Sequence, residues 1–542
     1  MKTLFLTIMC VLLSAFVMTT VSAQDIILPK PQQSGGLPVF DAVKQRHSNR
    51  EIIPDVPLDL QTMSNLLWAA WGFNREGMRT IPTGLNKQEL DVYAVLKEGV
   101  YRYDAAANKL LLIEKGDHRT KAGKQDYVYT APLNLIYVAD MEKGVGTGSY
   151  ISVGCAVENV YLLSASKGLA CRVRTGIDKD ALYSLLKLKD KQEALAGQTL
   201  AYPSTPEPQQ SVFPTEKPLP RASLAEQLPA AATEAFLGEF KTKKIDLHSV
   251  MILKNGKVVF EKWFNDNAPD KNHVMWSVSK TFTSMGVGFA VAEKRFSLDD
   301  KVISFFPDDC PKEISENLAA MKVRDLLIMS SGHDTDPTGT IPFRHKPEKF
   351  DGVRWEKRFF EHPVKNKPGS KFVYNSMATY MLSAIIQKTT GETLYNYLRP
   401  RLFEPLGIEN IVWDANPYGV NCGGWGLHIK TEDMAKLGQF MLQKGNWEGK
   451  QLLPELWIEE ATSRKILQDP KVKPEESGND WKQGYCYQIW RCRNNAFRAD
   501  GKDGQYIAVL PDQQSVVIIT ENTNDYQGVL NLIWEHLLPV LK

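Results

Sequence analysis

The spacing of Ser277 and Lys280 places a nucleophile and a base one helical turn apart. The run Ser277-Val278-Ser279-Lys280 opens a predicted helix over 281–294, and side chains three residues apart on a helix face the same way. A serine hydroxyl is a weak nucleophile until a base within hydrogen-bonding reach takes its proton. A lysine can be that base when burial or a neighbouring cation lowers its pKa. The pattern therefore predicts acyl transfer through Ser277.

The context of this motif separates it from a chance match, in which an N-capping serine precedes a surface lysine. Residues 276–282 and six later stretches, in the same order, resemble the penicillin-binding protein/class C β-lactamase superfamily. The later stretches are 323–332, 372–376, 402–407, 423–427, 433–436 and 500–505. The resemblance covers nearly all of 240–535. It implies an antiparallel sheet with an all-helical subdomain.

The resemblance assigns catalytic roles at three matching positions. Ser277 would attack an acyl carbon, Lys280 would take or relay its proton, and Tyr374, as phenol or phenolate, would be the second acid/base partner. The tyrosine motif departs from the family at one point. Asn commonly stands at its third position, whereas the order here is Tyr374-Asn375-Ser376.

The third motif of the resemblance is Lys502-Asp503-Gly504, directly before a predicted strand. Gly504 would let this strand approach the substrate closely, and the backbone N–H groups of Ser277 and Gln505 would form the oxyanion hole. Asp503 stands where Thr or Ser is usual, which argues against recognition of a carboxylate such as that of penicillin, although Lys502 could still bind an anion. The sequence thus favours an esterase, amidase or peptidase-like enzyme over a β-lactamase.

Other catalytic systems have weaker support in the sequence. The chain contains no G-x-S-x-G nucleophile elbow, so an α/β-hydrolase is not expected. His333 and His428 could join a serine/histidine system, but a lone histidine in a turn is more often structural. No C-x-x-C or H-E-x-x-H spacing indicates a metal site.

The N-terminal part carries a second set of chemistry-bearing residues. Two arginines flank a serine at Arg46, Ser48 and Arg50, and such a set can hold a phosphate by charge and hydrogen bonds. A Pro-Thr-Gly loop at 82–84, followed by Asn86, can bring backbone N–H groups against a flat flavin edge. Without the later motif, a solvated charged turn would be the simpler interpretation of the first.

Taken in order, these motifs resemble the FMN-dependent nitroreductase superfamily, in particular its peptide-thiazoline oxidase-like branch, over about 36–200. The resemblance implies bound FMN and a homodimer formed through this domain. It assigns to FMN the residues Arg46, Ser48, Arg50, Pro82, Thr83, Asn86 and Arg174. The alternative is a flavin-free domain with a structural role.

The elements that must position these residues form two domains, both predicted to be α+β. Six prolines mark a linker at 202–221 between a nitroreductase-like domain at 36–201 and a hydrolase domain at 222–542. In the first domain, helical spacing covers 58–71 and 152–167, and strands are expected at 91–96 and 135–139. In the second, a hairpin turns at Asn255-Gly256, and strands at 505–510 and 515–520 lie near the end.

Composition limits where the protein acts and on what. Lys2, an apolar run and the small residues before Gln24 predict a signal peptide at 1–23, and hence a periplasmic or secreted protein. The formal net charge of +2 gives no reason to expect a nucleic-acid partner. Buried free thiols are expected for the remaining cysteines, with Cys486 and Cys492 the one close pair that could bond.

The sequence therefore predicts an exported serine hydrolase, acting on a small-molecule or peptide acyl substrate, fused to an FMN-dependent oxidoreductase domain. Two alternatives stay open. One is a non-catalytic penicillin-binding-like sensor, in which Ser277 is acylated without turnover. The other is a hydrolase whose N-terminal domain is structural and binds no flavin.

Overall fold

The structure is a computed structural model that describes residues 24–33, 36–37, 39–144, 147–204, 217–341 and 352–542. The predicted signal peptide at 1–23 and much of the predicted linker lie outside these residues. Within the described ranges, no helix has both the length and the apolar character needed to cross a bilayer.

The N-terminal half is built around a seven-stranded sheet with the order β1-β6-β5-β4-β7-β9-β8, whose neighbouring strands are antiparallel. Its strands are β1 (Ile26–Ile27), β4 (Leu90–Val95), β5 (Gly99–Asp104), β6 (Lys109–Lys115), β7 (Leu133–Asp140), β8 (Ala170–Arg174) and β9 (Gln192–Ala201). A small hairpin joins β2 (Phe73–Arg75) to β3 (Met78–Arg79). The helices are α1 (Val39–Gln45), α2 (Leu60–Trp71), α3 (Asp126–Thr130), α4 (Gly148–Lys167) and α5 (Lys179–Leu185).

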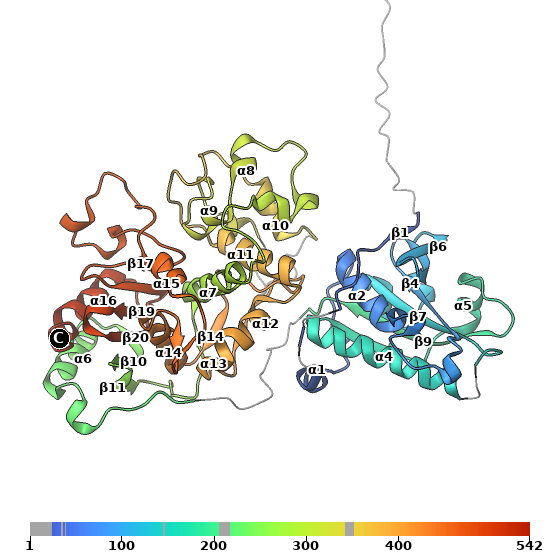
Figure 1. Ribbon diagram of the computed structural model, residues 1–542, viewed down its shortest axis with the longest axis horizontal. Helices are drawn as coiled ribbons and strands as arrows, with labels where there is room; N and C mark the ends of the chain where they lie inside the picture. The colour runs from blue at the N-terminus through green and yellow to red at the C-terminus, as the bar shows by residue number, and fades with distance from the viewer. Residues whose placement is uncertain (1–23, 34–35, 38, 145–146, 205–216, 342–351) are drawn as a thin grey trace, which may run out of the picture.

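Local sequence signals explain where the two long helices of this half begin and end. Asp59 caps α2 by accepting a hydrogen bond from the Thr62 N–H, which satisfies one of the donors left free at a helix start. Gly168 ends α4 in the left-handed region at φ 64°, a conformation that costs glycine little. Both helices pack in one core against the sheet, through side chains such as Leu66 and Val160 (Figure 1).

The C-terminal half is built around a six-stranded antiparallel sheet with the order β11-β10-β20-β19-β18-β17. Its strands are β10 (Asp246–Lys254), β11 (Lys257–Trp263), β17 (Trp490–Arg491), β18 (Phe497–Gly501), β19 (Gln505–Leu510) and β20 (Ser515–Asn522). The predicted hairpin turn is confirmed: Asn255 and Gly256 have φ values of 50° and 77°, as a two-residue turn with positive φ at both positions requires. The short strands are β12 (His273–Val274), β13 (Val412–Trp413), β14 (Leu427–Ile429), β15 (Asn446–Trp447) and β16 (Lys450–Gln451).

Helices cover both faces of this sheet and form a separate lobe beside it (Figure 1). On one face, α6 (Ala230–Thr242) and α16 (Tyr526–Leu532) pack in a core with β10, β19 and β20. On the other face lie α7 (Ser279–Ala292) and α14 (Thr431–Leu442). The remaining helices are α8 (Glu316–Ala320), α9 (Val323–Leu327), α10 (Trp355–Glu361), α11 (Ser376–Thr390), α12 (Leu394–Leu398), α13 (Glu404–Leu406) and α15 (Glu455–Thr462).

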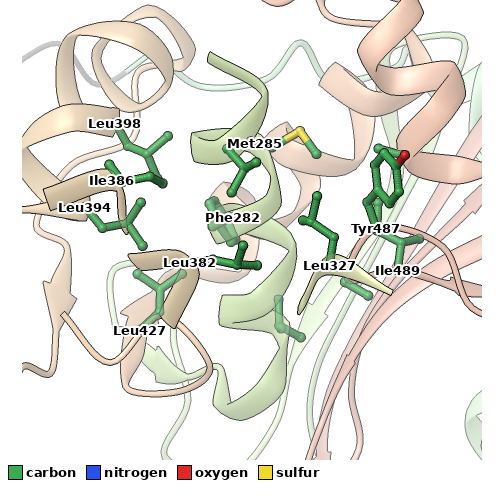
Figure 2. Close-up of a cluster of buried hydrophobic side chains, with 14 of the residues drawn as sticks. Phe282, Met285, Leu327, Leu382, Ile386, Leu394, Leu398, Leu427, Tyr487 and Ile489 are labelled. Atoms are coloured by element: carbon green, nitrogen blue, oxygen red, sulfur yellow. The ribbon is translucent and has the colours of Figure 1, made fainter. Parts of the chain in front are cut away.

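Helix α7 is the element that positions the predicted nucleophile. It is buried along most of its length, and its side chains Phe282 and Met285 pack in the same core as Leu382 and Ile386 of α11 (Figure 2). Because α7 is packed on several sides, its first turn does not fray, and the position of that turn is fixed. The chain thus has two domains, each combining helices with an antiparallel sheet, as the sequence predicted.

Candidate active site

Ser277 lies in a tight turn immediately before α7. The 3₁₀ turn η4 (Trp276–Val278) leads into the helix, and Trp276 takes a φ of 45°. Positive φ is rare for a bulky side chain and is found where the surrounding structure requires it. The turn leaves Ser277 half-buried beside the buried first residues of α7.

Lys280 lies beside Ser277, as the helical spacing predicts. Its Nζ donates to Ser277 Oγ at 2.9 Å and to the Gly424 carbonyl at 2.7 Å. The side chain is 1% exposed, and burial lowers the pKa of Lys280 to about 7, against smaller opposing effects of Asp336 and Asp500. A substantial fraction of Lys280 is therefore neutral near pH 7 and can accept the Ser277 proton.

Tyr374 completes the group at the nucleophile. The Lys280 Nζ lies 5.0 Å from the centroid of the Tyr374 ring, and that ring stacks on Trp490 with centroids 5.8 Å apart. Burial, then the Asp500 carboxylate, raises the pKa of Tyr374 well above its ordinary value, while a side-chain hydrogen bond with Ser277 opposes the rise. Tyr374 is thus a phenol at neutral pH and can donate a proton.

The strand that closes the site makes its close approach at Gly501, not at Gly504. A Cβ at Gly501 would lie 2.4 Å from the Met275 carbonyl, next to η4, whereas a Cβ at Gly504 would meet the Glu521 carboxyl. The position nearest η4 therefore belongs to a different glycine, and the predicted approach of Gly504 to a substrate stays a prediction. Gly501, at the end of β18, has that position.

The structure places the other residues of the predicted third motif in the turn between β18 and β19. The Lys502 ammonium lies 5.1 Å from the Trp276 ring centroid, and its side chain is 65% exposed at the edge of the site. The Gln505 side chain is buried and donates to the carbonyls of Lys502 and Glu521. Gln505 thus holds the turn in place, while Lys502, 3.9 Å from the Asp503 carboxylate, is exposed enough to meet a ligand.

Three features of the site were not assigned from the sequence. The Gly424 carbonyl fixes Lys280, and two carboxylates, Asp336 and Asp500, act on its charge. Gly424 and Asp500 lie in the stretches 423–427 and 500–505, which resemble the family. That resemblance could have identified them as residues near the site. Asp336 carried no such signal.

Histidine is not the base in this arrangement. The ring nitrogens of His333 are engaged by Ser331 Oγ at 2.9 Å and by the Phe359 carbonyl at 3.1 Å. Burial lowers the pKa of His333 to about 4, so this histidine is neutral and structural. His428 lies on β14 opposite Val274.

Asn375, the departure in the tyrosine motif, has a structural role. Its Oδ1 accepts from the Ala378 N–H at 3.0 Å and caps α11, and its Nδ2 donates to Ser331 Oγ at 3.3 Å. The side chain is therefore used inside the helical lobe and does not replace an asparagine at the third position, which here is Ser376.

In the N-terminal domain, both predicted flavin motifs meet one turn of α4. The Arg46 guanidinium lies 3.8 Å from the Glu158 carboxylate, and Ser48 Oγ is 2.8 Å from Tyr161 Oη. On the same turn, Asn159 Nδ2 donates to the Thr80 carbonyl, just before the Pro-Thr-Gly loop.

The solvent exposure of these residues separates those that can meet a ligand from one that cannot. Ser48, Arg50, Pro82 and Asn86 are exposed, and Arg46 and Thr83 are partly exposed. This exposed cationic and hydroxyl set fits a phosphate chemically.

Arg174 differs from the other predicted flavin contacts. It is 6% exposed, and its guanidinium donates to the Ala122 carbonyl at 2.9 Å, to Asn134 Oδ1 at 3.2 Å and to Thr199 Oγ1. The guanidinium that was predicted to contact the FMN phosphate donates instead to these internal acceptors. Arg174 is part of the domain core.

The six cysteines of the described chain are free thiols, as expected. Cys486 and Cys492 are both buried, and burial raises the pKa of the Cys486 thiol to about 12 and that of Cys492 to about 11. These thiols remain protonated at neutral pH and are not reactive groups of the site.

Comparison with known families agrees with this division of the chain. Residues 234–538 match the family model described as Beta-lactamase, and residues 43–202 match the model described as Nitroreductase family.

Individual relatives match each half at low identity. A 6-aminohexanoate-dimer hydrolase of Paenarthrobacter ureafaciens is 23% identical over 327 residues, which cover 55% of this chain and 81% of that protein. A protein named as a nitroreductase of Methanocaldococcus jannaschii is 29% identical over 168 residues, which cover 28% of this chain and 84% of that protein. A solved structure named as a nitroreductase of Ralstonia eutropha is 35% identical and has a TM-score of 0.32. The match covers 34% of this chain and 92% of the chain in that structure.

Proposed function

Because the chain belongs to the Beta-lactamase family through residues 234–538, we propose that it hydrolyses an ester, amide or peptide bond through an acyl-enzyme on Ser277. The observation that carries this proposal is the 2.9 Å contact between Lys280 Nζ and Ser277 Oγ, with burial lowering the pKa of Lys280 to about 7. A nucleophile and a base in hydrogen-bond contact are the arrangement that such catalysis requires.

In the proposed acylation step, Ser277 Oγ attacks the acyl carbon while neutral Lys280 takes the hydroxyl proton. Backbone N–H groups of Ser277 and of the strand end near Gly501, in place of the Gln505 N–H named from the sequence, would stabilise the developing oxyanion. Tyr374, held as a phenol, would donate a proton to the leaving group. The bond to the leaving group then breaks and leaves the acyl group on Ser277.

In the proposed deacylation step, a water attacks the acyl carbon and the proton flow reverses. Lys280 first returns the proton it took from Ser277 to the Tyr374 phenolate. Neutral Lys280 then takes a proton from the water and passes it to Ser277 Oγ, which leaves as the regenerated hydroxyl. A penicillin-binding-like sensor would stop before this step. Turnover beyond one product per site therefore distinguishes a hydrolase from a sensor.

The proposal predicts a covalent adduct on one residue. A fluorophosphonate should add one phosphonyl group per chain, with loss of fluoride, and peptide mapping by mass spectrometry should locate it on Ser277. The Ser277→Ala variant should remain unlabelled. The wild type should also turn over para-nitrophenyl butyrate for many cycles. Labelling at another serine, or a single burst without turnover, would contradict the proposed mechanism.

We also propose that the N-terminal domain binds FMN and forms a homodimer. The match to the Nitroreductase family model supports a flavin cofactor, and Arg46, Ser48 and Arg50 would hold its phosphate. When bound, the flavin would supply hydride transfer, and the protein would orient it.

Apolar side chains on the same domain favour a second copy as its partner. The side chains are 53% to 85% exposed, and they are Val39, Phe40, Val43, Leu85, Tyr150 and Ile151. Helix α1, which carries the first three, packs on α4. Burying such a patch against its counterpart removes apolar surface from water.

Export to the periplasm or outside the cell, through a signal peptide at 1–23, is part of the same proposal.

This second proposal predicts a coloured protein. The purified mature chain should show a visible flavin absorption that travels with it on gel filtration and is bleached by dithionite. Light scattering should give the mass of two chains. Arg50→Glu should lose the colour, whereas Arg75→Glu, on the β2–β3 hairpin outside the set, should keep it. A colourless protein that takes up no added FMN would support the flavin-free alternative.

A further inference from the structure

Two carboxylates from different parts of the fold flank the catalytic lysine. Asp336 lies in the helical lobe just before the 3₁₀ turn Pro337–Thr340, and Asp500 lies on β18 of the sheet. Both act electrostatically on Lys280 and on Tyr374. Both of these charges, from the helical lobe and from the sheet, are negative.

Asp500 is held by a buried arginine that cannot itself reach a substrate. Arg498 and Asp500 lie two residues apart on β18, so their side chains point to the same face of the sheet. Arg498 Nε donates to Asp500 Oδ2 at 2.9 Å. The Arg498 side chain is 0% exposed, whereas that of Asp500 is 7% exposed. The pair therefore has its cation fully buried and its anion slightly exposed.

The surroundings of Arg498 keep this orientation fixed. Its Nη1 donates to the Asp480 carbonyl at 3.2 Å, and its guanidinium lies 4.5 Å from the centroid of the Trp481 ring. Burial raises the pKa of the Asp500 carboxyl, and the contact with Arg498 opposes that rise. A rotation that brought the guanidinium toward the nucleophile would have to break these contacts.

Asp336 adds a charge of the same sign from the helical lobe. Its oxygens accept from the backbone N–H groups of Ser376 and Thr338 at 3.1 and 3.0 Å. The Lys502 ammonium is mostly exposed at the edge of the site, where water screens its charge.

We propose that Asp500 is a specificity-determining residue, which makes the site prefer acyl substrates with a cationic group near the scissile bond and disfavour those with a carboxylate there. The inference rests on the proposed hydrolase function and names its substrate class. A buried, preorganised charge discriminates between ligand charges more strongly than an exposed one.

The test compares three para-nitrophenyl esters of matched shape. Their acyl parts are γ-(trimethylammonio)butyrate, its uncharged tert-butyl isostere, and glutarate, which ends in a carboxylate. The wild type should give a kcat/KM at least about tenfold higher for the cationic than for the anionic ester, with the neutral ester between them. In Asp500→Asn the ratio should fall toward unity.

The matched control is Asp503→Asn, which removes the same formal charge three residues away in the partly exposed turn. It also tests Asp503, the residue that the sequence motif alone connected with disfavouring a carboxylate. It should leave the ratio near the wild-type value. Since Asp500→Asn leaves Arg498 without its partner, Arg498→Gln/Asp500→Asn serves as a second variant, with thermal unfolding to show that it is folded.

The outcomes separate this inference from the function on which it rests. If the neutral ester is turned over through Ser277 but the wild type shows no charge preference, or prefers glutarate, the inference is overturned and the hydrolase function stands. The same holds if Asp503→Asn lowers the ratio as much as Asp500→Asn. If none of the esters is turned over, both proposals fail.

Discussion

Lys280→Met is expected to lower kcat for ester hydrolysis by about 10²–10⁴-fold, the range over which positioned acid–base groups act. Methionine fills a similar apolar volume but cannot accept the Ser277 proton or donate to the Gly424 carbonyl. Steady-state kinetics with para-nitrophenyl butyrate measures the loss. Fluorophosphonate labelling of Ser277 should slow in parallel, because acylation is the step that needs the base.

Lys436→Met is the matched control for this prediction. Lys436 is also 1% exposed, but it donates to the Gly407 carbonyl and lies 3.5 Å from Asp433. Its loss should lower the melting temperature, because a buried carboxylate is left without its cation, and should leave kcat of the folded protein within a few-fold of wild type. A comparable loss of activity in both variants would mean that Lys280 acts through stability and not as the base.

The nucleophile could be predicted from sequence because its geometry is local. Ser277 lies in η4 and Lys280 in the first turn of α7, which continues it, so their spacing alone places the two side chains together. The positions of α2, α4 and the Asn255-Gly256 hairpin follow from equally local signals, namely helical periodicity and turn residues.

The third motif could not be placed in the same way. The chain repeats Asp-Gly with a spacing of three, at Asp500-Gly501 and again at Asp503-Gly504. Either glycine could end the strand beside η4, and the pairing of β18 with β19, in which Gly501 lies opposite Gln505, decides between them. Strand register depends on the whole sheet and not on the motif.

Arg174 shows the same limit in the N-terminal domain. The sequence around Arg174 gives no local sign that this arginine is buried. Its position is set by β9, where Gly197 lies opposite and a Cβ would approach Arg174 Nη2 to 3.0 Å. The missing side chain of Gly197 makes room for the guanidinium, and Asn134 and Thr199 supply acceptors from separate strands.

The pH dependence of hydrolysis should report the ionisation of Lys280 directly. Burial lowers the pKa of Lys280 from its ordinary value of 10.5 to about 7, and only the neutral amine can take the Ser277 proton. We therefore expect kcat/KM to fall about tenfold for each pH unit below about 7 and to level off above it. Initial rates with the neutral ester across this range, corrected for spontaneous hydrolysis, measure the curve.

The same ionisation has a defined effect on stability. Between about pH 7 and 10.5, the unfolded chain binds a proton at Lys280 that the folded chain does not, so this group's contribution to the free energy of unfolding rises with pH across that window. Below it, the folded protein bears the full cost of burying the charged ammonium. Activity and this part of the stability should therefore change in the same direction as pH increases.

Asp500→Asn tests whether the acidic limb of the pH profile belongs to Lys280. The Asp500 carboxylate raises the pKa of Lys280 against the stronger effect of burial, so its removal should move the acidic limb to lower pH, whereas Asp503→Asn should leave the limb in place. A rate that is independent of pH from about 5 to 9 would contradict a lysine base. A limb that stays in place in Asp500→Asn would mean that this carboxylate does not act on Lys280, and that the charge selection proposed for the site has another source.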